Sequence, residues 1–251
     1  MAEEGKAIDA LGQFELGTVF GPVGASVGFT QSNLYMLISG CLIVALMVLG
    51  MRQRAMVPGR MQSLAESAYG FIDDMLLAQV GSEGRRFFPF VFTLFMFILF
   101  GNMLGLFPYA FTYTSHISMT FVMALTVFVL ITVVAISLHG TKFFGYFFPE
   151  GAPIWLAPII IPVEIVSYLS RPISLSIRLF ANMVAGHVML KVFASFVVML
   201  GALGTIGPFI AIMPLAINVA LIGFEVLVAF LQAYVFAILT CIYLHDAVHL
   251  H

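Results

Sequence analysis

The chain has 251 residues, of which 62% are hydrophobic and only 9% charged, and its mean hydropathy is +1.10. Soluble domains are about 45–50% apolar and about 25% charged, so the composition excludes a soluble or disordered protein. Ten Lys and Arg against twelve Asp and Glu leave no basic face for nucleic acid. We therefore expect residues 1–251 to form one all-α polytopic membrane domain.

The N-terminal part of the chain is expected to be an external segment followed by a first span. Residues 1–32 contain acidic side chains such as Glu3 and Glu4 and lack the basic start of a signal peptide. Residues 33–51 are an apolar run. About 20 residues at 1.5 Å per residue cross about 30 Å of hydrocarbon, so this run is long enough to span a membrane.

A different kind of helix is predicted over residues 61–80. Pro58 and Gly59 break the chain before it, and Ser63 and Glu66 have the spacing of a capping box. This pattern favours an amphipathic helix in the membrane interface over a soluble helix covering another domain, because the chain contains no such domain. Its apolar side chains share one face: Leu64, Ala68, Phe71, Ile72 and Met75.

The next two spans, residues 87–110 and 117–138, are expected to form a tight helical hairpin. Their connection, residues 111–116, has no Lys or Arg, whereas residues 52–86 carry five of the ten basic residues in the chain. By the positive-inside rule, the N-terminus lies outside and residues 52–86 lie inside, as does Lys142 after the third span.

The second half of the chain contains two apolar runs that are too long for ordinary spans, residues 152–201 and 208–244. The second run alone would extend roughly 55 Å as a helix, nearly twice the hydrocarbon thickness. Either each run folds back inside the membrane or each is one long, strongly tilted helix. The first option leaves backbone groups unsatisfied, so we favour the second, with another membrane component shaping the tilt. The chain then has about five membrane-embedded helices.

A few polar residues inside these long runs are the best functional candidates, because a charge at the bilayer centre costs from about 2.5 to more than 10 kcal/mol. At 100° per residue they form two stripes, one on each predicted helix, that are able to face each other. The first contains Ser167, Arg171, Ser174, Arg178, Asn182 and Ala185, with His187 and Lys191 on the opposite face, and the second contains Asn218, Glu225, Gln232 and Asp246.

The residue types in these stripes differ in what they can do. Arg178 stays protonated at physiological pH, so it is a fixed positive charge and not a proton carrier. His187 titrates near neutrality, and a partly buried carboxylate such as Glu225 can be brought into that range, so these two residues can carry protons.

Structural interpretations of the same residues stay open. Arg178 and Glu225 can be a structural ion pair, and His187 alone can be a hydrogen-bonded core histidine. Arg171 and Lys191 are expected near helix ends with their charges reaching water. Asn102, with its neighbouring glycines, favours close helix packing over an ion site. No metal site is expected, and the terminal histidines and Asp246 receive no role.

The charges within residues 152–244 do not balance. Arg171, Arg178 and Lys191 are positive, and Glu164 and Glu225 are negative, so one positive charge remains over. We therefore expect an acidic residue on another membrane subunit to complete the site.

The run SRPISLSIRLFANMVAGH, from Ser170 to His187, closely resembles the signature of subunit a of the rotary F-type ATP synthase, and FGNMLGLFP at residues 100–108 is similar to that family too. The resemblance looks closest to the mitochondrial and related bacterial branch. It implies no enzyme activity on this chain alone, no nucleotide site and no cofactor. It implies as partners a c-subunit ring, peripheral-stalk b subunits, the rest of the synthase and the lipid bilayer. The expected location is the bacterial inner membrane, with the mitochondrial inner membrane as the alternative.

The resemblance also implies roles for particular residues. Arg178 takes the position of the essential arginine that attracts the ring carboxylate and blocks a direct proton leak between two offset half-channels. Asn182 and Gln232 match polar positions that flank it, and His187 and Glu225 match the pair that lines the outer half-channel. Further candidates, for the inner half-channel or as supporting polar groups, are Glu164, Ser174 and Asn218.

Two other classes of function compete with this interpretation. A secondary transporter or channel would bind substrate at Arg178 and Glu225, but such folds usually show repeated halves, and we find no internal repeat. A membrane electron-transfer subunit would need two deep imidazoles to ligate haem, and only His187 is placed deep in an apolar run.

Overall fold

The fold is known from a computed structural model, and its described part is helical. The expected external segment up to residue 28 and Lys142 lie outside the described residues. Those residues are 29–52, 57–107, 110–140, 143, 145, 154–204 and 206–249.

Five helices, the first of them α2, are long and apolar enough to cross a membrane, which confirms an all-α polytopic membrane protein. The short 3₁₀ helix η2 continues directly into α4 and belongs to the second of these five. The elements are α2 (Gln31–Met51), α3 (Arg60–Val80), η2 (Ser82–Phe87), α4 (Phe88–Gly105), η3 (Tyr113–Ser115), α5 (Ile117–His139), η5 (Ile154–Leu156), α6 (Ala157–Gly201) and α7 (Gly207–Val248).

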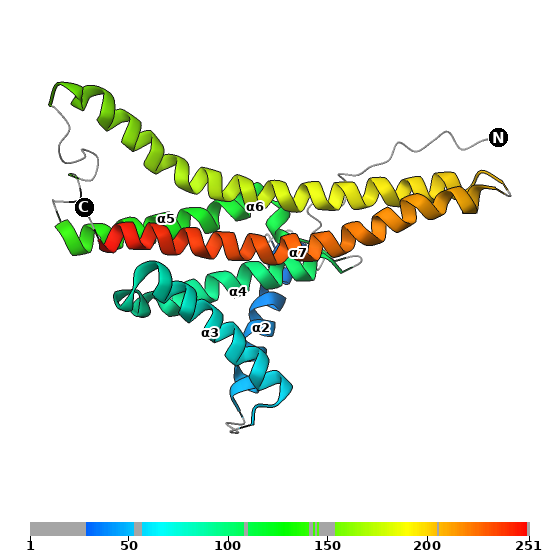
Figure 1. Cartoon of the computed structure of the whole chain (residues 1–251), viewed down its shortest axis with the longest axis horizontal. Coiled ribbons are helices and arrows are strands. Elements are labelled where there is room, and N and C mark those ends of the chain that lie inside the picture. The colour runs from blue at the N-terminus through cyan, green and yellow to red at the C-terminus, as the bar shows by residue number, and fades with distance from the viewer. Residues whose placement is uncertain are drawn as a thin grey trace.

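The two long apolar runs each form one continuous helix, as predicted. α6 has 45 residues and α7 has 42, which gives lengths of about 68 and 63 Å at 1.5 Å per residue. The two helices lie side by side and antiparallel, joined by a short turn at one end (Figure 1). The first turns of α6 bend away from α7 (Figure 1), and Pro162 and Pro172 inside the helix account for the bend, because each removes a backbone hydrogen bond.

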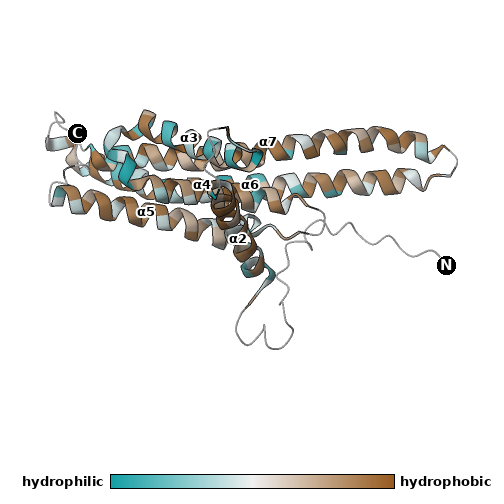
Figure 2. Ribbon diagram, turned by 90° about the horizontal axis from the view of Figure 1, so that it is seen from below, coloured by the Kyte–Doolittle hydropathy of each residue, from teal (hydrophilic) through white to brown (hydrophobic). Residues whose placement is uncertain are grey.

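α2 crosses the direction of the longer helices in both views (Figures 1 and 2). Its 21 residues match the hydrocarbon thickness. If α2 spans the membrane close to the normal, α6 and α7 must therefore lie steeply inclined. Their strong tilt stays a prediction, and this crossing favours it.

The buried core lies where α4, α5 and the second half of α7 meet α3 and the middle of α6. Side chains such as Phe236, Ile98 and Leu179 are fully buried there. Hydrophobic residues cover most of α2 and the ends of α6 and α7 that extend beyond the core, whereas hydrophilic residues gather on α3 (Figure 2). Only one half of the α6–α7 pair therefore packs against the rest of the chain in the core.

The structure corrects the predicted start of α3. The helix begins at Arg60, with the extended Gly59 before it and no side-chain cap, so Ser63 and Glu66 do not form a capping box. Glu66 instead accepts a hydrogen bond from Gln62 at 2.7 Å. Of the predicted apolar face, Ile72 and Met75 are buried in the protein, whereas Leu64 and Phe71 are exposed; the place of this helix in the membrane interface stays a prediction. The residues that pack inward are Ala65, Ile72, Met75, Leu76 and Val80.

Two helix ends differ from the prediction in ways that shape the site. α4 ends at Gly105, before the predicted end at residue 110. The chain beyond it turns inward and its residues 111–115 are buried. α7 continues past the apolar run, which ends at Leu244, as far as Val248. Its last turn therefore carries polar residues that the sequence placed in water.

Candidate functional site

Polar residues of the two long helices meet across the α6–α7 interface, but not as the two facing stripes that the sequence suggested. Ser174, Arg178 and Ala185 are exposed, whereas His187, expected on the opposite face of α6, lies against Glu225. The Asn182 amide donates a hydrogen bond to Gln232 Oε1 at 2.8 Å. One turn further along α6, His187 Nδ1 lies 3.6 Å from Glu225 Oε1. Because the helices are antiparallel, residue numbers that increase along α6 pair with residue numbers that decrease along α7. Four of the predicted site residues are thus brought together in two neighbouring contacts.

Glu225 is the most isolated of these polar groups. Its residue is only 5% exposed, and within the described part of the chain its two carboxylate oxygens accept no hydrogen bond. It approaches α6 closely because the facing residue is Gly186, where an added Cβ would lie 2.6 Å from Glu225 Oε1. A carboxylate in this setting depends on a proton or on a neighbouring cation. His187 is the titratable side chain whose contact with it the described residues show.

His187 contacts a second polar group through its other ring nitrogen. Its Nε2 lies 3.0 Å from the Thr112 hydroxyl, in the connection between α4 and α5. Lys191 follows one turn later on α6 and contributes a positive charge nearby. The imidazole therefore bridges a hydroxyl on one side and the Glu225 carboxylate on the other.

A groove of about 320 Å³ runs between α6 and α7 beside these contacts. Asn182, Glu225 and Gln232 line it together with apolar side chains such as Met189 and Phe224. Gln232 is only 3% exposed. The groove thus presents a short row of polar groups within an apolar wall.

Arg178 lies one turn before Asn182 on α6, and its side chain is exposed. Within the described part of the chain it forms no ion pair, so the structural pair with Glu225 is not formed. The neighbouring exposed residues are small or apolar, namely Ser174, Ile177, Ala181 and Ala185, except for the amide Asn182. Arg178 is therefore a fixed cation among uncharged side chains on this face.

The remaining predicted candidates lie away from the groove. Glu164 is half-exposed and lies 14 residues before Arg178 on α6, roughly 21 Å along the helix. Asn218 lies two turns before Glu225 on α7, and its Oδ1 is buried without a hydrogen-bond partner among the described residues. Ser174 is exposed one turn before Arg178.

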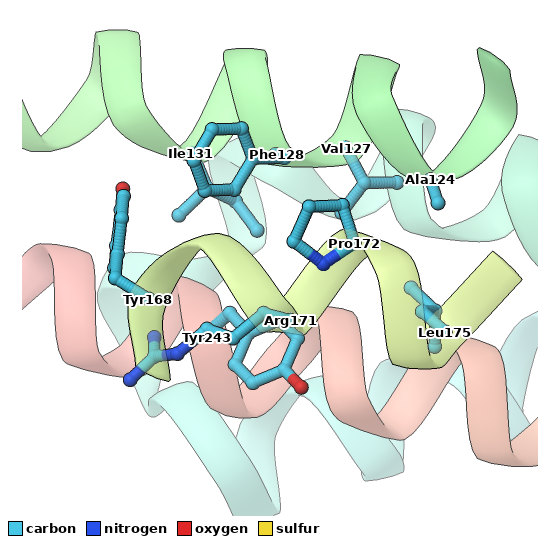
Figure 3. Close-up of a pocket in the computed structure, with 9 residues that line it drawn as sticks. All are labelled: Ala124, Val127, Phe128, Ile131, Tyr168, Arg171, Pro172, Leu175 and Tyr243. Carbon is cyan, nitrogen blue, oxygen red and sulfur yellow. The ribbon is translucent and has the colours of Figure 1, made fainter. Parts of the chain in front are cut away.

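The structure also pairs Arg171 with Asp246, a residue to which the sequence analysis gave no role. Arg171 forms an ion pair with Asp246 at 3.3 Å, so it does not simply extend to water as expected. Its guanidinium lies 4.8 Å from the centre of the Tyr243 ring and 5.3 Å from that of Tyr168. Figure 3 shows these side chains together, beside a small pocket between α5, α6 and α7 that Pro172 helps to line.

Sequence reasoning missed the contribution of the connection between α4 and α5. Asn102 on α4 accepts a hydrogen bond from Thr114 at 2.8 Å and donates one to the Ala229 carbonyl of α7 at 3.3 Å. This agrees with the packing interpretation of Asn102. The neighbouring Gly101 and Gly105 were the sequence feature that indicated this close packing. A side chain at either position would collide with residues of the connection.

Comparisons with known proteins point to a single family. The ATP synthase A chain family matches residues 33–245. The chain is 64% identical over 245 residues to ATP synthase subunit a of Granulibacter bethesdensis, which covers 97% of this chain and 98% of that protein. It is 59% identical over 252 residues to ATP synthase subunit a of Acidiphilium cryptum, with 100% of each chain covered. Subunit a of Gluconacetobacter diazotrophicus is 58% identical over 244 residues, 97% of this chain and 98% of its own.

Proposed function

Since the chain belongs to the ATP synthase A chain family, the proton-translocating stator subunits of the membrane sector, we propose that it supplies two offset half-channels to a rotating ring of c subunits. The ring carboxylates are loaded from one half-channel and unloaded into the other, so that proton flow drives rotation and ATP synthesis. The further partners are the peripheral-stalk b subunits, and the location is the bacterial inner membrane.

The observation that carries this proposal is the position of Arg178. It is an exposed cation, without an ion pair among the described residues, on a face of otherwise uncharged residues. An unpaired arginine in a membrane is costly unless a partner supplies the opposite charge. A ring carboxylate passing this face would provide it, and the guanidinium would favour the ionised carboxylate.

The groove beside Arg178 supports the outer half-channel. A proton enters at His187 and Glu225, passes along the groove past Gln232 and Asn182, and neutralises a ring carboxylate. The neutral carboxyl group then moves through the lipid with the rotating ring. It releases its proton when it returns to Arg178 from the other side.

The inner half-channel lies, in this proposal, on the side of Arg178 that faces the start of α6. Glu164 is the carboxylate on that side, and Ser174 is a polar group between the two. Arg178 separates the two half-channels. Because a guanidinium does not give up its proton, it blocks a direct leak between them.

The test is Arg178→Ala in the complete synthase in its membrane. We expect ATP-driven proton pumping to be lost and the passive proton leak to rise, because the barrier and the counter-charge for the ring are both removed. The matched control is Arg60→Ala, an exposed arginine at the start of α3, which should leave pumping and leak unchanged. Retained pumping in the Arg178 variant would overturn the proposal.

A further inference from the structure

Residues 111–115, in the connection between α4 and α5, are unusual for a connection in being buried. Phe111, Thr112, Tyr113, Thr114 and Ser115 are each 6% exposed or less. Buried hydroxyl groups are unfavourable unless they are hydrogen-bonded. Each polar group in this connection therefore needs a partner in the protein, and the partners show what the connection does.

Most of these partners fix the connection in place. The Tyr113 hydroxyl donates to the Phe97 carbonyl at 2.6 Å, and the Ser115 hydroxyl donates to the Thr112 carbonyl at 2.6 Å. Thr114 is tied through Asn102 to the backbone of α7. These bonds account for three of the four hydroxyls without involving a titratable group of the groove.

The fourth hydroxyl, that of Thr112, is the exception. It lies 3.0 Å from His187 Nε2, and no other side-chain hydrogen bond of this hydroxyl is formed within the described residues. Thr112 reaches this place because Gly105 has no side chain, since a Cβ there would collide with the Thr112 side chain. The backbone is therefore shaped to bring one hydroxyl to one imidazole.

A threonine hydroxyl suits an imidazole that gains and loses a proton. The hydroxyl can donate to Nε2 when the neutral ring carries its proton on Nδ1, the nitrogen that faces Glu225. It can accept from Nε2–H when the ring is protonated. A single hydroxyl thus holds the ring orientation in both states.

We propose that Thr112 is a positioning residue for proton transfer, which holds His187 in the orientation that aims Nδ1 at Glu225. This rests on the proposed function, because it assigns the connection between α4 and α5 a part in the outer half-channel. Thr112 does not itself exchange a proton with the ring carboxylate.

The surroundings of His187 are consistent with this role. The groups that face it include Glu225 from α7, Lys191 from the next turn of α6 and the Thr112 hydroxyl from the connection. Burial lowers the pKa of His116 and raises the pKa of Tyr113 in the same connection, so both are neutral at pH 7. The connection therefore acts on His187 through a hydrogen bond and not through a charge.

The experiment compares Thr112→Val with Thr112→Ser in the complete synthase, measured as ATP-driven proton pumping in inverted vesicles from pH 6 to 9. Val keeps the shape of threonine and removes the hydrogen bond, whereas Ser keeps the hydroxyl. We expect pumping at neutral pH to fall roughly three- to tenfold in the Val variant, since one hydrogen bond contributes about 0.5–1.5 kcal/mol. The pH profile should move to lower pH, because the acceptor for Nε2–H of the protonated ring is lost.

The controls separate positioning from mere packing. Thr112→Ser should restore both the rate and the pH profile. Thr126→Val, at an exposed threonine on α5 that bonds only to its own helix at 2.8 Å, should leave both unchanged. A Val variant with the parent pH profile, whatever its amount in the membrane, would overturn the inference and leave Thr112 a packing residue.

A further variant keeps the inference testable if the Val variant does not assemble into the synthase. Thr112→Cys replaces the hydroxyl by a thiol, which is a weak donor and acceptor, and it should shift the profile in the same direction. A Cys variant that matches the parent would also overturn the inference. If Arg178→Ala blocks pumping while the Thr112 variants have no effect, only the positioning role fails; if Arg178→Ala pumps normally, the proposed function itself fails.

Discussion

His187 and Glu225 are arranged differently from a structural ion pair. Their closest atoms are 3.6 Å apart, and the carboxylate accepts no hydrogen bond among the described residues. A pair that serves stability alone is usually closer and carries further hydrogen bonds that offset the loss of water. On the far side of the ring His187 also contacts the Thr112 hydroxyl, so the imidazole has a polar neighbour on each side.

Replacing Glu225 with Gln tests the carboxylate at the centre of this arrangement. The amide has the same shape but takes up no proton at neutral pH, so we expect proton pumping to slow by roughly tenfold or more, with an altered pH dependence. Pumping in inverted vesicles measures both effects. Glu66→Gln, at an exposed carboxylate on α3, is the matched control. An unchanged rate in the Glu225 variant would remove this residue from the proton path.

At the residue scale, the sequence showed which side chains are expensive in a membrane, but it did not show their partners. Arg178, His187 and Glu225 stand out because charged and titratable groups are rare in apolar runs. Thr112 does not stand out, because a threonine in a short connection is ordinary in composition and follows no periodic pattern. Its importance arises only from the inward turn of the chain after α4.

At the scale of the elements, three polar contacts fix the relative position of α6 and α7. His187 with Glu225, Asn182 with Gln232, and Arg171 with Asp246 follow one another along the two antiparallel helices. Glu225, Asn182 and Gln232 line the groove. The Arg171–Asp246 pair lies nearer the start of α6 and the end of α7, next to Tyr168 and Tyr243. A slip of one helix along the other would break all three contacts together.

We expect Asp246→Asn to weaken this arrangement, because Arg171 loses its counter-charge in a partly buried place. The cost is about 1 kcal/mol, since both side chains keep some access to solvent. The measurement is the amount of this chain retained in the purified synthase after mild heating. Asp74→Asn, at an exposed carboxylate on α3, should have no effect.

The double variant Arg171→Gln with Asp246→Asn checks that the two charges act on each other. It should retain more of the chain than either single change, because no buried charge is left without a partner. Additive losses in the double variant would show that the two residues act separately.

The sequence predicted the long helices better than their ends. Continuous apolar runs were enough to predict the two long helices α6 and α7. The helical spacing did not predict that His187 meets Glu225 while Arg178 is exposed. The apolar run stops at Leu244, so Asp246 was placed in water, yet Arg171 stabilises one more helical turn there. The capping-box pattern at Ser63 failed because that spacing also occurs inside a helix that has already started.

At the scale of the whole molecule, only one part of the α6–α7 pair is covered by the rest of the chain. The remaining part extends beyond the core as an antiparallel pair with hydrophobic surfaces (Figures 1 and 2). Exposed side chains there include Phe196, Met199, Phe209 and Met213. Lipid and the proposed ring are the neighbours that suit such surfaces.

The predicted orientation of the chain is testable with single cysteines in a Cys41→Ser background, since the other cysteine, Cys241, is buried. Gln31 is exposed at the start of α2, and Val57, before α3, is 85% exposed. A membrane-impermeant maleimide should label Gln31→Cys in right-side-out vesicles and Val57→Cys only in inverted vesicles. The reverse pattern would contradict the positive-inside assignment.

The exposed position of Arg178 has a consequence for biosynthesis. A newly inserted chain that has not yet met its ring presents a bare guanidinium to lipid, at a cost of at least about 2.5 kcal/mol near the bilayer centre. The lipid-exposed Arg178 therefore distinguishes a chain that has not assembled with the ring from one that has. We expect cells that lack the ring to degrade this chain quickly, so that unassembled copies do not accumulate and open a path for ions.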